Sequence, residues 1–198
     1  LILYILCILD STDCFYTMAS IAAAPLDRLY DLVTTMDSSD EDIAKQVGSI
    51  LAENKGIDLE HGFTDKKNTL LIAAAKVYRI ETVKVLIDNG AKVNAKDKDN
   101  ETPLHIASGF SFALVKFLIG KGVNVNSTNK NGETPLHVAI KTSNFEIAEF
   151  LIKLGASVSR NNVWGETPLH LAAQLSGHQA FAIVRLLIEA GANVNARL

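Results

Sequence analysis

Apolar residues recur at helical spacing in short segments, and polar stretches that contain glycine separate these segments. The stretch 127–132 is one such separator, and its composition is typical of a tight turn. Two apolar patterns follow it, each with the i, i+3, i+4 spacing of one helix face. Their positions are Leu136, Ala139 and Ile140 in the first helix, and Ile147, Phe150, Leu151 and Leu154 in the second. The pattern predicts pairs of short antiparallel helices joined by turns.

The tetrapeptide Thr-Pro-Leu-His occurs three times, at spacings of 32 and 33 residues, and a degenerate copy begins one period earlier at Thr69. Threonine can cap the free N–H groups of a helix start, and proline suits the first helical position. Each copy therefore predicts where a helix begins. The motif residues are Thr102, Pro103 and His105, then Thr134, Pro135 and His137, then Thr167, Pro168 and His170.

A second signature recurs in phase with the first and consists of a glycine followed by a short segment that contains valine. Glycine is favoured directly after a helix, where the backbone often needs a positive φ. Each glycine therefore predicts the end of the second helix of a pair. The four positions are Gly90, Gly122, Gly155 and Gly191.

The period of about 33 residues and the T-P-L-H-x-A pattern resemble the ankyrin repeat family. The resemblance covers residues 69–195 and is closest at 131–139 and 164–173. It implies an all-α fold, an α-solenoid of stacked helix-turn-helix repeats with short β-hairpin-like fingers. It also implies that the motif histidines are structural and bond between neighbouring units. The expected organisation is an apolar, unstructured segment 1–24, a capping half-repeat 25–60, and an array 61–198 with repeats at 61–94, 95–126, 127–159 and 160–195.

The capping half-repeat is predicted from residues before the first copy of the motif. A helix is expected over 42–54, started by a capping-box pattern at 38–41. Its apolar stripe is formed by Ile43, Val47, Ile50 and Leu51.

Three departures from the pattern predict an irregular inner surface. The first copy has Leu70 and Ile72 where the others have proline and histidine. The second copy is one residue short near 108–111, and the fourth has about three extra residues near 175–178. The array is expected to continue beyond Leu198, because no polar capping helix follows the last signature.

The chain opens with nine apolar residues, 1–9, which are too few to span a bilayer. Three interpretations stay open: upstream readthrough before a natural start at Met18, a truncated membrane or export segment, or a buried strand. Cys7 and Cys14 are the chain's two cysteines, so no disulfide framework holds the body together. A reducing, cytoplasmic setting is expected, with the apolar run leaving membrane association open.

Composition and charge exclude several classes of function. With 48% hydrophobic and 21% charged residues, the chain is an ordinary folded protein rather than a disordered one. Residues 1–60 carry 11 acidic and 3 basic side chains and residues 61–198 carry 11 and 16, which gives net charges of -8 and +5. The overall charge of -3 argues against nucleic acid as the partner.

No common catalytic or cofactor motif is present in the sequence, so neither an enzyme nor a cofactor is expected. The three motif histidines do not predict a zinc site. Stacked units lie roughly 10 Å apart, whereas zinc ligands lie about 2 Å from the metal. No metal site is therefore predicted.

The resemblance implies a noncatalytic module that binds a partner protein through its fingers and its concave helix face. Variable residues on these elements mix cations and apolar groups, which suits a peptide or helix better than a small molecule. Trp164, the sole tryptophan, is either an interface anchor or a local packing residue. The alternatives are a membrane-tethered scaffold or an interaction segment of a larger multidomain protein. The candidate contact residues are Lys76, Asp97, Asp99, Phe110, Asn131, Lys141, Trp164 and Leu175.

Overall fold

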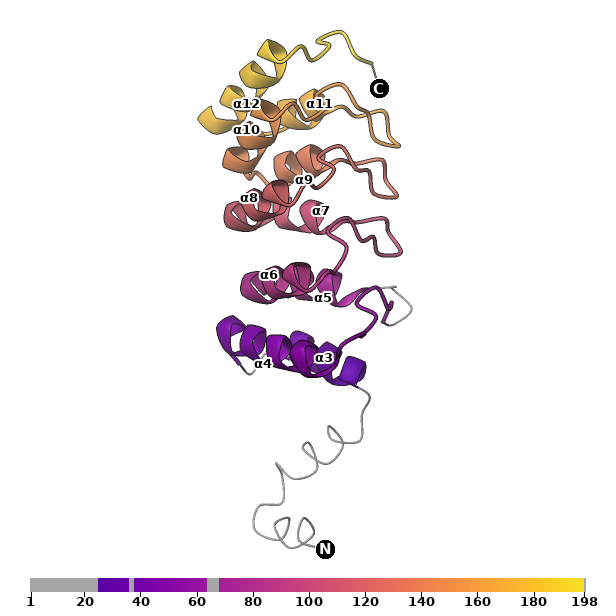
Figure 1. The fold of residues 1–198 in the computed structure, drawn as a ribbon. Coiled ribbons are helices and arrows are strands. Elements are labelled where there is room, and N and C mark those ends of the chain that lie inside the picture. The colour runs from indigo at the N-terminus through magenta and orange to yellow at the C-terminus, as the bar shows by residue number, and fades with distance from the viewer. Residues whose placement is uncertain (1–24, 36–37, 64–67, 198) are drawn as a thin grey trace, which may run out of the picture.

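The computed structural model describes residues 25–35, 38–63 and 68–197, which form ten α-helices stacked as antiparallel pairs (Figure 1). The all-α solenoid predicted from the repeats is confirmed. The helices are α3 (Pro25–Thr34), α4 (Asp40–Glu53), α5 (Leu70–Lys76), α6 (Ile80–Asp88), α7 (Pro103–Ser108), α8 (Phe112–Gly120), α9 (Pro135–Lys141), α10 (Phe145–Lys153), α11 (Pro168–Ala173) and α12 (His178–Glu189).

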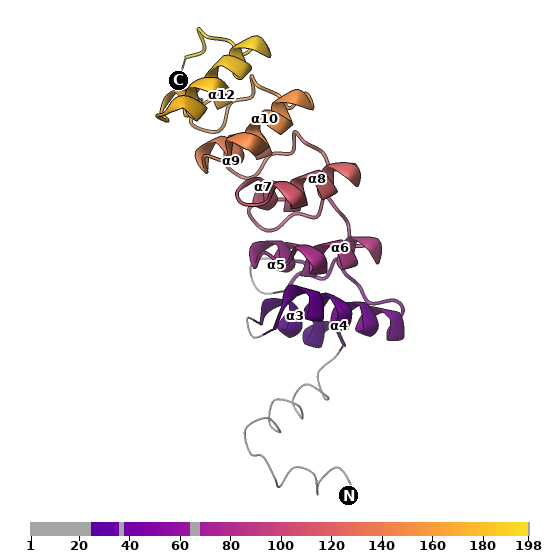
Figure 2. The ribbon, with the colours of Figure 1, turned by 90° about the vertical axis from the view of Figure 1, so that its left-hand side faces the viewer.

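The helices stand in two rows (Figures 1 and 2). The first helix of each pair packs against the first helix of the next, from α3 through α5, α7 and α9 to α11. The loops that lead into α7, α9 and α11, residues 89–102, 121–134 and 154–167, project from the side of this row and are called the fingers. Helices α5, α7, α9 and α11 and the three fingers together form the inner face.

Threonine begins the first helices, as the motif predicts. The Thr102 hydroxyl accepts a hydrogen bond from the His105 N–H at 3.4 Å, and Pro103 occupies the start of α7. Thr69 caps α5 in the same way, with the Ile72 N–H at 3.3 Å, although this copy lacks the proline and histidine. A threonine hydroxyl at the N-cap therefore suffices to start the helix without the proline and the histidine.

Glycine ends the second helices. Gly155 has φ 80°, and its N–H donates to the Ile152 carbonyl at 2.9 Å while the Ala156 N–H donates to the Leu151 carbonyl at 3.0 Å. These two bonds satisfy carbonyls that the end of α10 would otherwise leave free. Positive φ values also occur at the three equivalent glycines, Gly90, Gly122 and Gly191.

The core runs along the whole stack between the two rows. Leu136, Ala139 and Ile140 of α9 are fully buried, and so is Leu151 of α10. Leu154, which the sequence pattern placed in the second helix, is the residue after the last residue of α10 and is 44% exposed.

The helix of the capping half-repeat begins earlier than predicted. Helix α4 starts at Asp40, and its N-cap is Ser39, whose hydroxyl accepts from the Asp42 N–H at 3.2 Å. Ser39 and Asp42 therefore form the start of the helix in place of the pattern expected at 38–41. The limits predicted for this half-repeat and for the four repeats stay a prediction.

Two of the three departures from the repeat pattern accompany a change in the length of a helix. The extra residues near 175–178 accompany a longer helix, since α12 has 12 residues where α6, α8 and α10 have nine. In the short second copy, α7 has six residues where α5 and α9 have seven. Within the described residues, β-pairing is limited to an isolated bridge between Phe63 and Asn68, and the fingers are closed loops.

Residues 1–9, Cys7, Cys14 and Met18 lie outside the described residues, so the predictions made for them are untested. No helix among the described residues combines the length and the apolar character needed to cross a membrane.

Candidate protein-binding surface

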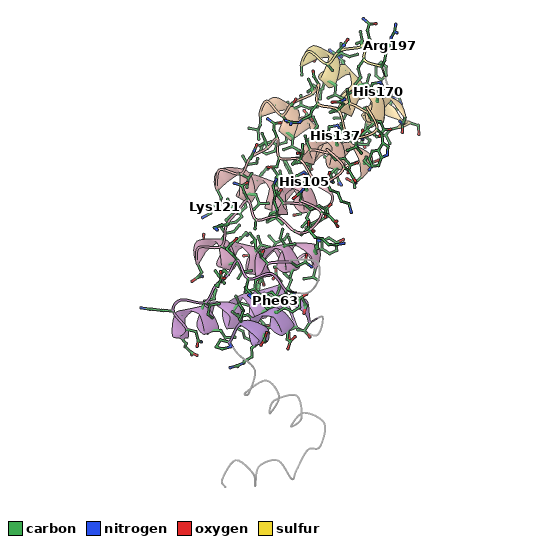
Figure 3. All side chains as sticks on the ribbon, turned by 90° about the vertical axis from the view of Figure 1, so that its right-hand side faces the viewer. Phe63, His105, Lys121, His137, His170 and Arg197 are labelled. Atoms are coloured by element: carbon green, nitrogen blue, oxygen red, sulfur yellow. The ribbon has the colours of Figure 1, made fainter. Side chains whose placement is uncertain are left out.

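The motif histidines form a row along the inner face (Figure 3). Nδ1 of His105 accepts from the Thr102 backbone N–H at 3.3 Å, so the ring proton lies on Nε2, which donates to the Glu133 carbonyl at 3.0 Å. His137 bonds the Glu166 carbonyl in the same way at 3.4 Å. These histidines therefore join one repeat to the next finger.

Burial lowers the pKa of both His105 and His137, which keeps the rings neutral at physiological pH. No group of three or more histidine, cysteine, aspartate or glutamate side chains in the described part of the chain is arranged to hold a metal ion. The arrangement therefore serves packing between repeats.

Each finger is closed by a buried Asp or Asn side chain. Oδ1 of Asp97 accepts from the backbone N–H groups of Asp99 at 2.8 Å and Glu101 at 2.9 Å. Asn129 and Asn162 make the equivalent pairs of bonds in the next two fingers. The Asp97 side chain is 1% exposed, so it is too buried to contact a partner as predicted. Its role is to hold the loop in one conformation.

Neighbouring fingers are also joined to one another through the next two candidates, Asp99 and Asn131. The Lys130 N–H donates to the Asp99 carbonyl at 2.7 Å, and the Lys130 ammonium lies 2.8 Å from the Asp99 carboxylate. The Val163 N–H donates to the Asn131 carbonyl at 2.9 Å. The fingers thus form a hydrogen-bonded ladder, with Asp99 and Asn131 half-buried in it.

The asparagines of the second signature strengthen this ladder. Oδ1 of Asn94 accepts from the Asn124 N–H at 3.1 Å, and Oδ1 of Asn126 accepts from the Ser157 N–H at 2.8 Å. A rigid row of fingers results, on which exposed side chains are held at fixed spacing.

Lys141 and Trp164 lie together at the third and fourth repeats. The Lys141 ammonium contacts Oε1 of Glu133 at 2.6 Å and lies 5.9 Å from the centre of the Trp164 ring. Hydrogen bonds from Lys141 and Asn129 outweigh the effect of burial on Glu133 and lower the pKa of its carboxyl. Trp164 is 56% exposed, so most of its ring is available for contact.

A second cluster contains two of the candidates, Lys76 and Phe110, and a residue that the sequence analysis missed. Tyr78 lies in the turn between α5 and α6, has φ 62° and is 63% exposed. Its ring packs edge-on against the Phe110 ring, with centroids 4.3 Å apart. Both rings border a hollow of about 320 Å³. Other side chains that line it are Lys76, Glu101, Ile106 and Val138.

Comparison of the repeats at one turn position could have identified Tyr78 from the sequence. The position is the residue just before the N-cap of the second helix of each pair. This position is Tyr78 in the first repeat and Phe110 in the second, but the polar Ser143 in the third. Aromatic residues in adjacent copies of an exposed turn indicate a surface patch. Leu175, the remaining candidate, is half-buried against the core at the last repeat and belongs to neither cluster.

Comparison with known proteins agrees with this architecture. A search of curated proteins gave no match. A family model described as ankyrin repeats, three copies, matches residues 38–129 and again residues 108–197. Since these overlapping matches cover well over half of the chain, and the structure shows the stacked helix pairs, the chain belongs to the ankyrin repeat family.

Proposed function

We propose that this chain is a noncatalytic module that holds a partner protein against its inner face. Ankyrin repeats are generally protein–protein interaction modules. The observation that supports the finer proposal is the pair of exposed aromatic side chains: Trp164 lies on the finger ladder, and Tyr78 lies at the edge of the inner face, in the turn after α5. Exposed aromatic residues on a preorganised surface are typical anchors of protein interfaces.

The charge pattern supports a protein partner over a nucleic acid. Several cations of the inner face are engaged by neighbouring carboxylates, among them Lys141 by Glu133 and Lys130 by Asp99. A nucleic-acid surface needs free cations in a patch. The same face serves equally in the two alternatives, a membrane-tethered scaffold and a segment of a larger multidomain protein.

The double variant Trp164→Ala, Lys141→Glu tests the proposed face. Dodecapeptides selected from a random displayed library on the intact chain serve as probes, and their affinity is measured by fluorescence anisotropy. The affinity of the probes for the variant is expected to be lower by about tenfold or more, because an aromatic anchor and its neighbouring cation are both removed.

Lys153→Glu is the matched control, because Lys153 lies on α10 outside the inner face. It makes the same charge change and is expected to leave affinity unchanged. Circular dichroism checks that both variants keep their helices. Failure to select any binding peptide, or equal affinity of the probes for the double variant, contradicts the proposed function.

A further inference from the structure

We propose that the hollow bordered by Tyr78 and Phe110 receives an arginine side chain of the partner protein. This inference rests on the proposed function and names the chemistry of one contact. The hollow lies beside His105 of Figure 3, where side chains of α5, α7 and α9 meet. Its volume of about 320 Å³ leaves room for one long side chain and some water.

The walls of the hollow suit a side chain with an apolar stem. Ile106 and Val138 supply aliphatic surface, and Tyr78 and Phe110 supply two aromatic rings that pack edge-on against each other. The Tyr78 backbone holds a positive φ, which is rare for a bulky residue and keeps its ring at the exposed edge. An arginine stem packs on such rings, and its flat guanidinium can stack on an aromatic face.

The charge balance at the hollow calls for a cation. Lys76 serves two carboxylates, since its ammonium lies 2.5 Å from Oδ2 of Asp97 but 4.0 Å from Oε2 of Glu101. Asp97 is the buried partner, so Lys76 is committed to it. Glu101 borders the hollow with about a third of its side chain exposed and therefore carries an excess negative charge toward it.

The surroundings of Glu101 disfavour its charge. Burial, and next the neighbouring Asp97 carboxylate, raise the pKa of the Glu101 carboxyl. A guanidinium that entered the hollow would offset this repulsion by pairing with Glu101.

Other carboxylates on this part of the inner face already have close partners. Glu133 is paired with Lys141 at 2.6 Å, and Asp99 with Lys130 at 2.8 Å. In the described part of the chain, the cation within ion-pairing distance of Glu101 is Lys76, at the outer limit. On this part of the inner face, Glu101 is therefore the carboxylate that lacks a close cation.

Arginine fits better than lysine. Its planar head can pair with a carboxylate through two hydrogen bonds while it stacks on a ring. The lysine ammonium is a compact and strongly hydrated charge, which loses more water on entering a partly apolar site. Replacement of the arginine by lysine is therefore expected to weaken binding.

The test uses fluorescein-labelled dodecapeptides selected on the intact chain and their derivatives in which arginine is replaced by citrulline. Citrulline keeps the shape of arginine but has no charge. Selected peptides are expected to share an arginine, and its replacement is expected to weaken binding to the unmodified chain by about tenfold or more. With Glu101→Gln the same replacement is expected to change affinity less than about twofold, because the carboxylate that senses the charge is gone.

Two further variants complete the test. Glu149→Gln also removes one carboxylate, but from α10, where Glu149 pairs with Lys153. In this variant the loss of affinity on replacing arginine by citrulline should be the same as in the unmodified chain. Tyr78→Asn removes the ring while keeping a residue type that tolerates positive φ, so it should fold and bind the arginine peptides more weakly.

The outcomes separate this inference from the proposed function. Suppose that the peptides bind and that Trp164→Ala, Lys141→Glu weakens them. If they share no arginine, or if citrulline weakens binding to Glu101→Gln as much as to the unmodified chain, the arginine site is wrong and the inner-face function stands. If lysine peptides bind as well as arginine peptides, the assignment to arginine is overturned. If no peptide binds, both proposals fail.

Discussion

Two amide-for-carboxylate differences decide how two equivalent lysines are used: Asp97 of the next finger corresponds to Asn162, and Asn68 of the lysine's own repeat corresponds to Glu133. Lys76 and Lys141 occupy the same position of the first helix in their repeats. Lys76 reaches the next finger, where Asp97 offers a carboxylate, but the equivalent residue facing Lys141 is the neutral Asn162. Lys141 therefore turns to the carboxylate of Glu133 in its own repeat. Lys141 thereby neutralises Glu133 in the third repeat, whereas Glu101 at the hollow beside Lys76 keeps an excess negative charge.

The buried histidines make stability depend on pH. Burial lowers the pKa of His105 and His137 below the ordinary value of 6.5, so the unfolded chain binds more protons than the folded one in mildly acidic solution. The free energy of unfolding should therefore fall as pH drops from 7.5 to 5.5, by on the order of 1 kcal/mol for each histidine. Urea unfolding at both pH values measures this.

The control for that prediction is His105→Gln, which removes one titrating ring. It lowers stability at both pH values but should show a shallower dependence on pH. The carboxylates with lowered pKa, such as Glu133, contribute in a lower range, below the ordinary value of 4.5. An unchanged pH dependence in the variant would show that His105 does not carry the effect.

At the scale of elements, two charged side chains join the first helix pair to α6. Arg79 is buried, and its guanidinium donates to the carbonyls of Val33 at 3.1 Å, Ser38 at 3.2 Å and Thr35. These carbonyls lie at and beyond the end of α3, where the helix dipole is negative. Asp40 accepts from the Glu81 N–H at 2.7 Å, at the positive start of α6. Each charge thus satisfies a helix end of the neighbouring unit.

Arg79→Met should therefore loosen α3 and α4 from the array. It leaves three backbone carbonyls without their charged donor, a loss of about 2–3 kcal/mol. We expect a lower free energy of unfolding and faster proteolysis within residues 25–54. Arg185→Met, at an exposed position of α12, is the control and should change stability by less than about 0.5 kcal/mol. Proteolysis at an unchanged rate would contradict the proposed link.

At the scale of the whole molecule, each helix pair packs only on its neighbours, so stability is distributed along the stack. The pair α11 and α12 packs against α9 and α10 on one side. On α12, Phe181 is 73% exposed and Ile188 is 46% exposed. The central pairs are covered on both sides.

Hydrogen exchange of this chain should follow that difference. In a polypeptide of residues 1–198, backbone amides of α11 and α12 are expected to exchange faster than those of α7 to α10, because α11 and α12 contact one neighbouring pair among the described residues and the central pairs contact two. Exchange followed by mass spectrometry at the level of peptides measures the gradient. Equal protection along the stack would mean that the repeats open as one unit.

The sequence by itself determined where helices begin and end and that they repeat. Thr102 and Gly155 act through hydrogen bonds and dihedral angles within a few residues, so their roles can be predicted from local sequence. The repeat period then predicts that the helix pairs stack, and stacked helix pairs form an all-α solenoid. The family resemblance placed Trp164 on a finger but left open whether it packs locally, and the structure shows that it is 56% exposed.

The tertiary structure alone decided which polar residues are used inside the protein and which are left for a partner. Asp97 was a candidate contact but is buried in its finger, and Tyr78 was missed although it borders the hollow. Arg79 bonds residues more than 40 positions earlier in the chain, at separations of 41, 44 and 46. These roles depend on distances between repeats and on competition for a shared cation. Local sequence patterns contain neither, because both arise only when the helix pairs are stacked.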